Sequence, residues 1–185
     1  AQAPAGRLRR VPASELVDRV RREQELVATA WPDVAGRVDA AVRHAASELE
    51  QPGLSGAEPV LCHGDFTPGQ VVRVPGGLGL LDLDTLALGD PASDIGRFLA
   101  YAAMREETIG DPASRAAAAR TDFLAAYGIS PGAADEAGLV TRVWAHRRLN
   151  LALIALRATR RFKSARAALA LTLLDTSDPT PGRLP

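Results

Sequence analysis

The chain has 185 residues, 46% of them apolar, and 22 acidic side chains balance 22 Lys and Arg side chains, so the formal net charge is zero. This length and apolar content suit one globular domain with a sizeable core, and the balanced charge gives no field that would steer nucleic acid or an anionic membrane to the protein. No apolar stretch approaches the roughly 20 residues of a membrane span, and residues 1–10 lack the apolar segment of a signal peptide, so we expect a cytoplasmic protein.

The N-terminal third predicts a linker and two helices. Residues 1–12 are rich in Pro, Ala and Arg and are expected to form the linker. Ser14 is a favourable N-cap for the first helix, which Pro32 ends, and Pro32 also suits the first turn of the second helix. His44 falls outside the apolar stripe of that second helix and is expected to be a solvated surface residue. The two stripes, at helical spacing, are Leu16, Val20, Val27 and Trp31, then Val34, Val38, Ala41, Val42, Ala45 and Leu49.

A β-rich patch follows between residues 60 and 83. The apolar run from Val60 to Cys62 predicts a short buried strand, in which the only cysteine of the chain is an inert thiol. A second run, Gln70 to Val74, is joined to a third, Leu78 to Leu83, by a turn at Pro75-Gly76-Gly77, where Pro fixes φ and Gly accepts positive φ. We therefore expect one small β-hairpin element in an otherwise helical chain.

Helices are expected again at approximately 91–106, 112–127, 137–160 and 164–174. Asp90 can cap the first of them, with Pro91 in its first turn, and Gly128 ends the second. Ser130-Pro131 is expected to open the helical region that leads into the third. The tail from Asp175 to Pro185 is Pro-rich and is expected to fray.

Polar side chains gather around the hairpin. His63 and Asp65 lie in the loop after the first strand, and Asp82 and Asp84 lie at the end of the third run. Protein kinases place an amide residue five positions after the Asp of a His-x-Asp loop, and a second Asp further on. Here Gln70 is five positions after Asp65, and Asp82 is seventeen. One carboxylate would meet an attacking hydroxyl, while an amide oxygen and a second carboxylate would hold Mg²⁺, a cation that prefers oxygen ligands.

Three blocks of sequence carry a family resemblance. They are His63-Gly64-Asp65-Phe66-Thr67-Pro68-Gly69-Gln70, Leu81-Asp82-Leu83-Asp84 and Gly89-Asp90-Pro91-Ala92-Ser93-Asp94-Ile95-Gly96. In this order they resemble the aminoglycoside phosphotransferase and choline kinase-like family, which has a protein-kinase-like fold and transfers the γ-phosphate of a nucleotide to a small-molecule hydroxyl. The specific part covers roughly residues 60 to 100. The resemblance implies an α+β, mainly α-helical chain in which residues 13–176 form the C-terminal lobe, with residues 177–185 as a tail.

The resemblance also implies roles for single residues. Asp65 would be the catalytic carboxylate and His63 would brace its loop, while Gln70 and Asp82 would ligate Mg²⁺ for ATP or another nucleoside triphosphate. Asp94 would be buried and hydrogen-bond the catalytic loop, and Asp84 would support the metal ligands, contact substrate or simply end a turn. The polar residues that interrupt the apolar stripe of the long helix usually form a solvated face, but in this family such positions can line the acceptor pocket; they are His146, Arg147, Arg148 and Asn150.

One residue departs from the family pattern. Asn is usual where this chain has Gln70, which keeps the amide oxygen but adds a methylene group. Some sugar-kinase relatives, maltokinases among them, resemble this chain in having Gln there, so the departure puts the metal geometry in question rather than the activity.

A complete kinase also needs a phosphate-covering loop and a lysine for the nucleotide phosphates. No Gly-x-Gly-x-x-Gly precedes residue 60, Gly76 to Gly79 belong to the hairpin, and Lys163, the only lysine, comes far too late. We therefore expect a nucleotide lobe before Ala1 in a longer protein, and an isolated chain that is inactive.

Three classes of function stay open. The first is a small-molecule kinase, whose partners are a nucleotide and an acceptor rather than nucleic acid or membrane; sugar, aminoglycoside, choline-like and amino-alcohol acceptors all fit. The second is a non-catalytic relative that binds a small molecule or a partner. The third is a metal-dependent hydrolase with His63, Asp65, Asp82 and Asp84 as ligands, which ranks last because only His44 and His146 remain as further histidines.

Overall fold

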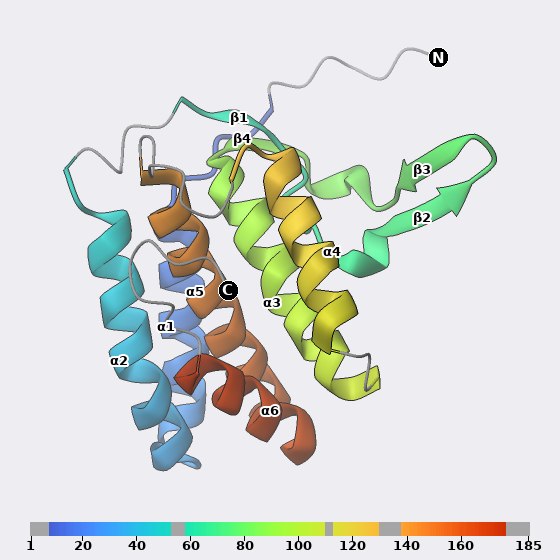
Figure 1. The fold of residues 1–185 in the computed structure, drawn as a ribbon. Helices are drawn as coiled ribbons and strands as arrows, with labels where there is room; N and C mark the ends of the chain where they lie inside the picture. The colour runs from blue at the N-terminus through green and yellow to red at the C-terminus, as the bar shows by residue number, and fades with distance from the viewer. Residues whose placement is uncertain (1–7, 53–57, 110–112, 130–137, 177–185) are drawn as a thin grey trace.

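The computed structural model describes residues 8–52, 58–109, 113–129 and 138–176, which form a mainly helical body with two small antiparallel sheets (Figure 1). This confirms the predicted fold class. No helix in the described ranges is both long and apolar enough to cross a membrane.

Four helices supply most of the main core, to which residues 91–109 add Ala100 and Met104. The predicted apolar stripes are the buried faces: Val20 and Val27 in the first helix, and Val38 and Val42 in the second, are almost completely shielded from solvent. His44 is exposed beside Glu48, with 3.4 Å between Nε2 and the carboxylate, as expected of a surface residue. The four helices are α1 (Ser14–Ala28), α2 (Pro32–Leu49), α5 (Leu139–Arg160) and α6 (Ser164–Asp175).

The long helix α5 is the centre of this body. It contacts α1, α2, α3 and α6, and it is buried around most of its circumference, as expected of a helix surrounded by other elements. Of the two interpretations left open for its polar residues, a solvated face does not hold for His146, Arg148 and Asn150, which are all buried. Helix α3 covers His146 and Asn150, through Gly96 and Arg97, whereas Arg148 is ion-paired with Glu48 of α2.

Helices α3 (Pro91–Ile109) and α4 (Ala113–Ala126) lie beside this body (Figure 1). Asp90 caps α3 as predicted, since its Oδ1 accepts a hydrogen bond of 3.0 Å from the Ala92 amide. Gly128 follows α4 with φ of 76°, and the Ile129 amide returns to the Leu124 carbonyl at 3.0 Å. The expected cap at Ser14 is wrong: Ser14 is the first residue of α1, Ala13 stands at the cap position, and no side chain bonds there.

The predicted hairpin is present as β2 (Val71–Val74) and β3 (Gly77–Leu80), which pair antiparallel. It projects from the helical body (Figure 1). The strand β1 (Val60–Cys62) pairs instead with β4 (Ala87–Gly89), a strand that the sequence did not predict. Two short 3₁₀ turns, Pro68–Gln70 and Leu83–Thr85, flank the hairpin. The β1–β4 pair therefore closes the base of the segment that carries all the polar motifs.

The single cysteine lies inside this base. Cys62 is a free, buried thiol, and burial raises its pKa to about 11, so it stays protonated at neutral pH. This agrees with the predicted inert thiol.

Helices α3 and α5 approach most closely at Gly96. A Cβ atom at this position would lie 2.6 Å from both the His146 Cβ and the Val143 carbonyl oxygen, and 2.8 Å from the Arg147 amide nitrogen. Because two of these three neighbours are backbone atoms, rotation of a side chain cannot relieve the overlap. The absent side chain of Gly96 therefore sets the distance between the two helices.

Replacing Gly96 by Ala should consequently destabilise the chain. Overpacking of a tight contact typically costs about 1–3 kcal/mol, more than the roughly 1 kcal/mol that Ala adds to helix propensity. Urea unfolding of the 185-residue chain, followed by circular dichroism, measures the effect. Gly36→Ala is the matched control, because Gly36 lies exposed in α2 with nothing within 4 Å of its would-be Cβ, and it should stabilise the chain. Equal changes in the two variants would contradict the close approach.

Candidate active site

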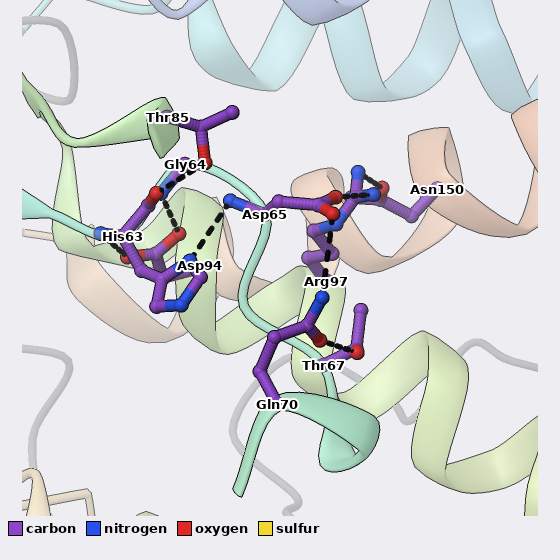
Figure 2. Close-up of polar contacts among 9 residues, drawn as sticks. All are labelled: His63, Gly64, Asp65, Thr67, Gln70, Thr85, Asp94, Arg97 and Asn150. Atoms are coloured by element: carbon purple, nitrogen blue, oxygen red, sulfur yellow. Dashed lines mark hydrogen bonds and ion pairs between the residues drawn. The ribbon is translucent and has the colours of Figure 1, made fainter. Parts of the chain in front are cut away.

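One buried carboxylate fastens residues 63–70, called here the 63–70 loop, to α3. Asp94, in the first turn of α3, accepts hydrogen bonds from the His63 amide at 2.6 Å and from the Gly64 amide at 3.0 Å (Figure 2). The charge of this buried group is compensated by the two amides and by its place near a helix N-terminus. The start of the loop is thus held at two consecutive backbone positions.

Gly64 lets the loop pass close to the turn at Leu83–Thr85. Its φ is 80°, and a Cβ there would lie 2.4 Å from the Thr85 carbonyl oxygen. The Thr85 hydroxyl donates to the His63 carbonyl at 2.7 Å. Only glycine fits this position, since both the backbone conformation and the space exclude a side chain.

His63 braces the loop from inside. Its ring is buried, and Nε2 lies 2.8 Å from the Leu81 carbonyl oxygen. A carbonyl can only accept, so Nε2 carries the hydrogen, and Nδ1 is left to accept from the Asp65 amide at 3.4 Å. Both ring nitrogens are therefore engaged in holding the backbone, which suits an orienting role and leaves no lone pair for use as a general base.

Asp65 has a partly exposed carboxylate, with 37% of its side-chain surface accessible. Its Oδ1 forms an ion pair with the guanidinium of Arg97, and its Oδ2 lies 3.5 Å from the Gln70 amide nitrogen. Figure 2 shows Arg97 between Asp65 and Asn150, and a second nitrogen of Arg97 lies 3.4 Å from the Asn150 Oδ1. Asp65 is in this way linked through α3 to α5.

Sequence reasoning missed Arg97. It lies three positions after Asp94, so the two side chains project from the same face of α3 toward the 63–70 loop. This spacing was the available signal, because a helix that bonds the loop through one residue also presents the residue one turn later to it. The guanidinium also lies over the Tyr101 ring, 5.2 Å from its centroid, which fixes its plane.

The hairpin places the backbone of Gln70 beside Leu81, the residue before Asp82. The Leu81 amide donates to the Gln70 carbonyl at 2.9 Å, so Asp82 begins one residue away from Gln70. The Thr67 hydroxyl donates to the Gln70 Oε1, which orients the amide but leaves that oxygen a second lone pair. Asp82 is exposed and has φ of 64°, the conformation that turns the chain out of β3.

These two oxygen donors fit part of a magnesium shell. Mg²⁺ usually binds protein through one or two carboxylates and completes its six ligands with phosphate oxygens and water. The described residues hold no group of three or more His, Cys, Asp or Glu side chains that could bind a metal ion. His63, Asp65, Asp82 and Asp84 are all described, so they do not form the ligand cluster that a metal-dependent hydrolase would need.

A pocket of about 340 Å³ opens beside the loop, between the start of α1, the Leu83–Thr85 turn, α3 and α5. Gly64, Asp84 and Arg97 line it from the loop side, and His146 and Asn150 line it from α5. Arg147, the third residue of α5 expected here, is not among the lining residues; its guanidinium lies over the Trp144 ring, 5.2 Å from the centroid.

His146 is the least satisfied side chain of this pocket. It is fully buried, and neither ring nitrogen has a hydrogen-bond partner among the described residues. Burial lowers its pKa to about 4; the cation of Arg142 acts in the same direction and the nearby Asp90 carboxylate opposes it. The imidazole is therefore neutral at pH 7, with one donor and one acceptor.

The opposite side of the loop is aromatic. Phe66 stacks on Phe98 of α3 with 5.0 Å between ring centroids, and Phe98 stacks on Phe123 of α4 at 4.1 Å. Tyr127 continues the series at 5.3 Å from Phe123. This stack holds α4 against the 63–70 loop, and periodicity alone gave no sign of it because its members come from three separate elements.

Residues 1–139 match the phosphotransferase enzyme family, and the chain therefore belongs to that family. No curated protein matches the chain.

Solved structures share its fold at low sequence identity. A glucosamine kinase superimposes with a TM-score of 0.60 at 21% identity, over 90% of this chain and 46% of its own. A choline/ethanolamine kinase family protein from Mesorhizobium loti gives 0.57 at 16% identity, over 97% and 57%. The GDP complex of aminoglycoside 2'-phosphotransferase-IIIa gives 0.53 at 18% identity, over 90% and 52%. The chain thus spans about half the length of these structures, and at such identities the likeness shows the fold alone.

The anchor at Asp94 makes a first prediction for the site. In Asp94→Asn, the amide can accept at its oxygen, but its NH₂ group would face a second N–H donor, so one loop hydrogen bond is lost. We expect a loss of about 1–3 kcal/mol in the free energy of unfolding and faster hydrogen exchange at the His63 and Gly64 amides. NMR-detected exchange on the 185-residue chain measures this. Asp18→Asn, on the exposed face of α1, is the control; unchanged exchange at both loop amides would refute the anchor.

From the burial of His146 we predict that the free energy of unfolding depends on pH. The unfolded chain binds a proton at this residue near pH 6.5, whereas the folded chain does so only near pH 4. As pH falls from about 6.5 to about 4, the unfolded state therefore takes up more protons than the folded state. The free energy of unfolding is unaffected by this residue above that window and decreases within it by up to about 1.4 kcal/mol per pH unit. Urea midpoints between pH 7.5 and 4.5 should fall less steeply in His146→Leu than in the wild type. His44→Gln should keep the wild-type slope, and an identical slope in His146→Leu would contradict the prediction.

Proposed function

We propose that the protein containing this chain transfers the γ-phosphate of ATP, or of another nucleoside triphosphate, to a hydroxyl group of a small molecule. The observation that carries the proposal is the placement of Asp65. Its carboxylate is partly exposed and held in a fixed direction, while the residue before it and its ion-pair partner, Gly64 and Arg97, both line the pocket. Membership of the phosphotransferase enzyme family supports this chemistry.

The chain's own residues suit the proton transfer. Oδ1 of Asp65 is occupied by Arg97, and the contact of Oδ2 with Gln70, at 3.5 Å, lies at the limit of a hydrogen bond. Oδ2 is therefore the oxygen to which an acceptor hydroxyl would donate. In this role Asp65 aligns the hydroxyl for attack on phosphorus and receives its proton, while His63 and Asp94 keep the loop in register.

Gln70 and Asp82 are the residues that would hold Mg²⁺, with His146 and Asn150 on the acceptor side. When bound, the cation would neutralise charge on the phosphate oxygens of the nucleotide. The fit rests on the chemistry of these two side-chain oxygens and on the backbone hydrogen bond that joins Gln70 to Leu81, the residue before Asp82.

We propose further that residues 13–176 act together with a nucleotide-binding lobe. The only lysine of the sequence, Lys163, lies at the turn between α5 and α6, far along the chain from the loop. The hairpin and the residues after it also expose large apolar side chains, which a covering lobe would remove from water. They are Val74, Leu78, Leu80, Leu81 and Leu83.

The isolated chain should accordingly show no ATP turnover in an ADP-release assay. Turnover that is abolished by Asp65→Ala would refute this prediction.

A non-catalytic binding protein is the second candidate, favoured by Gln70 in place of the usual Asn and by the ion pair that occupies one oxygen of Asp65. Titration calorimetry of the full-length protein with Mg·ATP, combined with a search for turnover, separates the two. Nucleotide binding without transfer to any acceptor would select the binding protein.

The proposed roles predict that Asp65→Asn and Asp82→Asn fail in different ways in the full-length enzyme. Asp65→Asn should lower kcat by about 10²–10⁴-fold and leave Mg·ATP affinity nearly intact, since an orienting base is lost and no metal ligand. Asp82→Asn removes a charge facing the cation, so Mg²⁺ and nucleotide affinity should fall together with the rate. Steady-state kinetics across a Mg²⁺ series measure both.

Gln70→Asn tests the unusual amide in the same series. It restores the residue more usual in the family but shortens the reach by one methylene, so the rate should fall and the Mg²⁺ requirement should rise. Equal losses of nucleotide affinity in Asp65→Asn and Asp82→Asn would show that the two roles are assigned wrongly. Unchanged turnover in both would remove the kinase proposal.

A further inference from the structure

We propose that the pocket beside the 63–70 loop takes a single uncharged sugar ring, and that Arg97 is the residue that selects this ligand against amines. The inference rests on the proposed function for the identity of the pocket as the acceptor site. It narrows the acceptor from the four classes that the sequence left open, and it depends on the charge, the aromatic content, the free polar atoms and the size of the pocket.

The carboxylates in the pocket wall are already engaged. Glu15 is ion-paired with Arg9, and Asp90 accepts from the Nε of Arg142 at 2.7 Å. Asp94 is used by the two loop amides. A polycationic aminoglycoside would need several carboxylates free to meet its ammonium groups, because burying an unpaired charge is costly. These three side chains are not free to do so.

The remaining charges favour repulsion of a cation. Asp84 is the one further carboxylate in the described wall, and it is exposed. Arg97 and Arg19 both line the pocket; the pKa of Arg19 is lowered by burial, then by the positive charges of Arg157 and Arg97, while the Glu15 and Asp65 carboxylates act in the opposite direction. Arg97 lines the pocket whereas its ion-pair partner Asp65 does not, so the guanidinium is the member of this pair that faces the pocket, and an ammonium group on the ligand would place a second positive charge beside it.

The pocket also lacks the means to hold a quaternary ammonium group. Such ligands are recognised over aromatic faces. No Phe, Tyr or Trp side chain is among its described lining residues. The aromatic residues nearest in sequence to the motif stack on one another instead: Phe66, Phe98 and Phe123, with Tyr127 beyond them. A choline-like acceptor would find no cage here.

The polar atoms that remain suit hydroxyl groups. Among the lining residues, Nε of Arg97 and both ring nitrogens of His146 are buried and lack a hydrogen-bond partner. Buried polar atoms without partners are rare in native proteins, and they call for a ligand or water. A neutral imidazole offers one donor and one acceptor, and a sugar hydroxyl is both, so the two are complementary without any charge. The lining Asn150 amide, 3.4 Å from Arg97, belongs to the same wall.

Size points to one ring. A volume of about 340 Å³ lies at the low end of the roughly 300–1,000 Å³ found for small-molecule sites. A monosaccharide fits this space better than an aminoglycoside of three rings. Because Arg97 is ion-paired with Asp65, its charge stands beside the reacting hydroxyl, where it would meet any amino group on a neighbouring ring carbon.

Direct binding to the 185-residue chain tests the inference without phosphoryl transfer. The matched probes are D-glucose and D-glucosamine, which differ by one hydroxyl exchanged for an ammonium group; D-mannose, D-galactose and myo-inositol widen the uncharged set. Choline and neamine represent the two excluded classes. NMR titration of the His146 ring and Arg97 side-chain signals measures the binding. We expect at least one uncharged probe to bind, and its amino counterpart to bind about tenfold more weakly.

Two variants assign the selection to Arg97. Arg97→Gln should bring the affinities of the uncharged sugar and its amino counterpart to within about threefold, because the repelling charge is gone. Arg97→Lys keeps the charge and should keep most of the discrimination. Arg21→Gln, on α1 outside the pocket, is the control and should behave as the wild type, and the circular dichroism spectrum of each variant checks its fold.

The outcomes separate this inference from the proposed function. Three results would each overturn the inference. The amino sugar could bind as tightly as its uncharged counterpart, choline or neamine could bind at these residues, or no uncharged probe could bind at all. A full-length protein without kinase activity, whose pocket still prefers uncharged sugars, would refute phosphoryl transfer and leave the pocket as described. An active enzyme that phosphorylates D-glucosamine in preference to D-glucose would support phosphoryl transfer and refute the inference about the pocket.

Discussion

The two hydrogen bonds from the 63–70 loop to the Asp94 carboxylate are the constraint on which the rest of the site depends. A loop is intrinsically the least fixed part of a fold, and this one has to present Asp65 in one direction. Binding two consecutive amides with one buried charge fixes both the position and the orientation of the peptide between His63 and Gly64. Gly64 itself has φ of 80° and lies so close to Thr85 that a Cβ atom would be 2.4 Å from the Thr85 carbonyl oxygen, so this peptide requires glycine.

The same helix that anchors the loop also joins it to the core. Gly96 allows α3 to approach the backbone of α5, and one residue further on Arg97 lies between Asp65 and Asn150 (Figure 2). The packed pair α3 and α5 thereby supports Arg97 at the loop. Such support can position Asp65, a loop residue, as precisely as a residue on a helix or strand. A shift of α5 would be transmitted to Asp65 through this contact.

The sequence predicted most helices, the hairpin and the residues of the motif, because those features are local: stripes at helical spacing, Pro and Gly at the ends, and short blocks of fixed spacing. It did not predict β4, whose three residues pair with β1 on one side and, at Leu88, with the backbone of Arg9 and Val11 on the other. Nor did it predict Arg97, the aromatic stack or the burial of His146, since each depends on the approach of elements far apart in the chain. The predicted cap at Ser14 was wrong although serine is locally favoured there, because the helix begins one residue earlier and places Ala13 at the cap position.

One oxygen of Asp65 is ion-paired with Arg97, which at first sight argues against Asp65 as the group that receives a proton. Phosphoryl transfer relaxes this requirement, because its transition state is largely dissociative and the attacking hydroxyl loses its proton late. Alignment then contributes more than basicity, and a carboxylate whose Oδ1 is fixed by Arg97 offers Oδ2 in a narrow range of directions. The ion pair that occupies Oδ1 of Asp65 is, on the proposed function, the same contact that directs Oδ2 toward the acceptor hydroxyl.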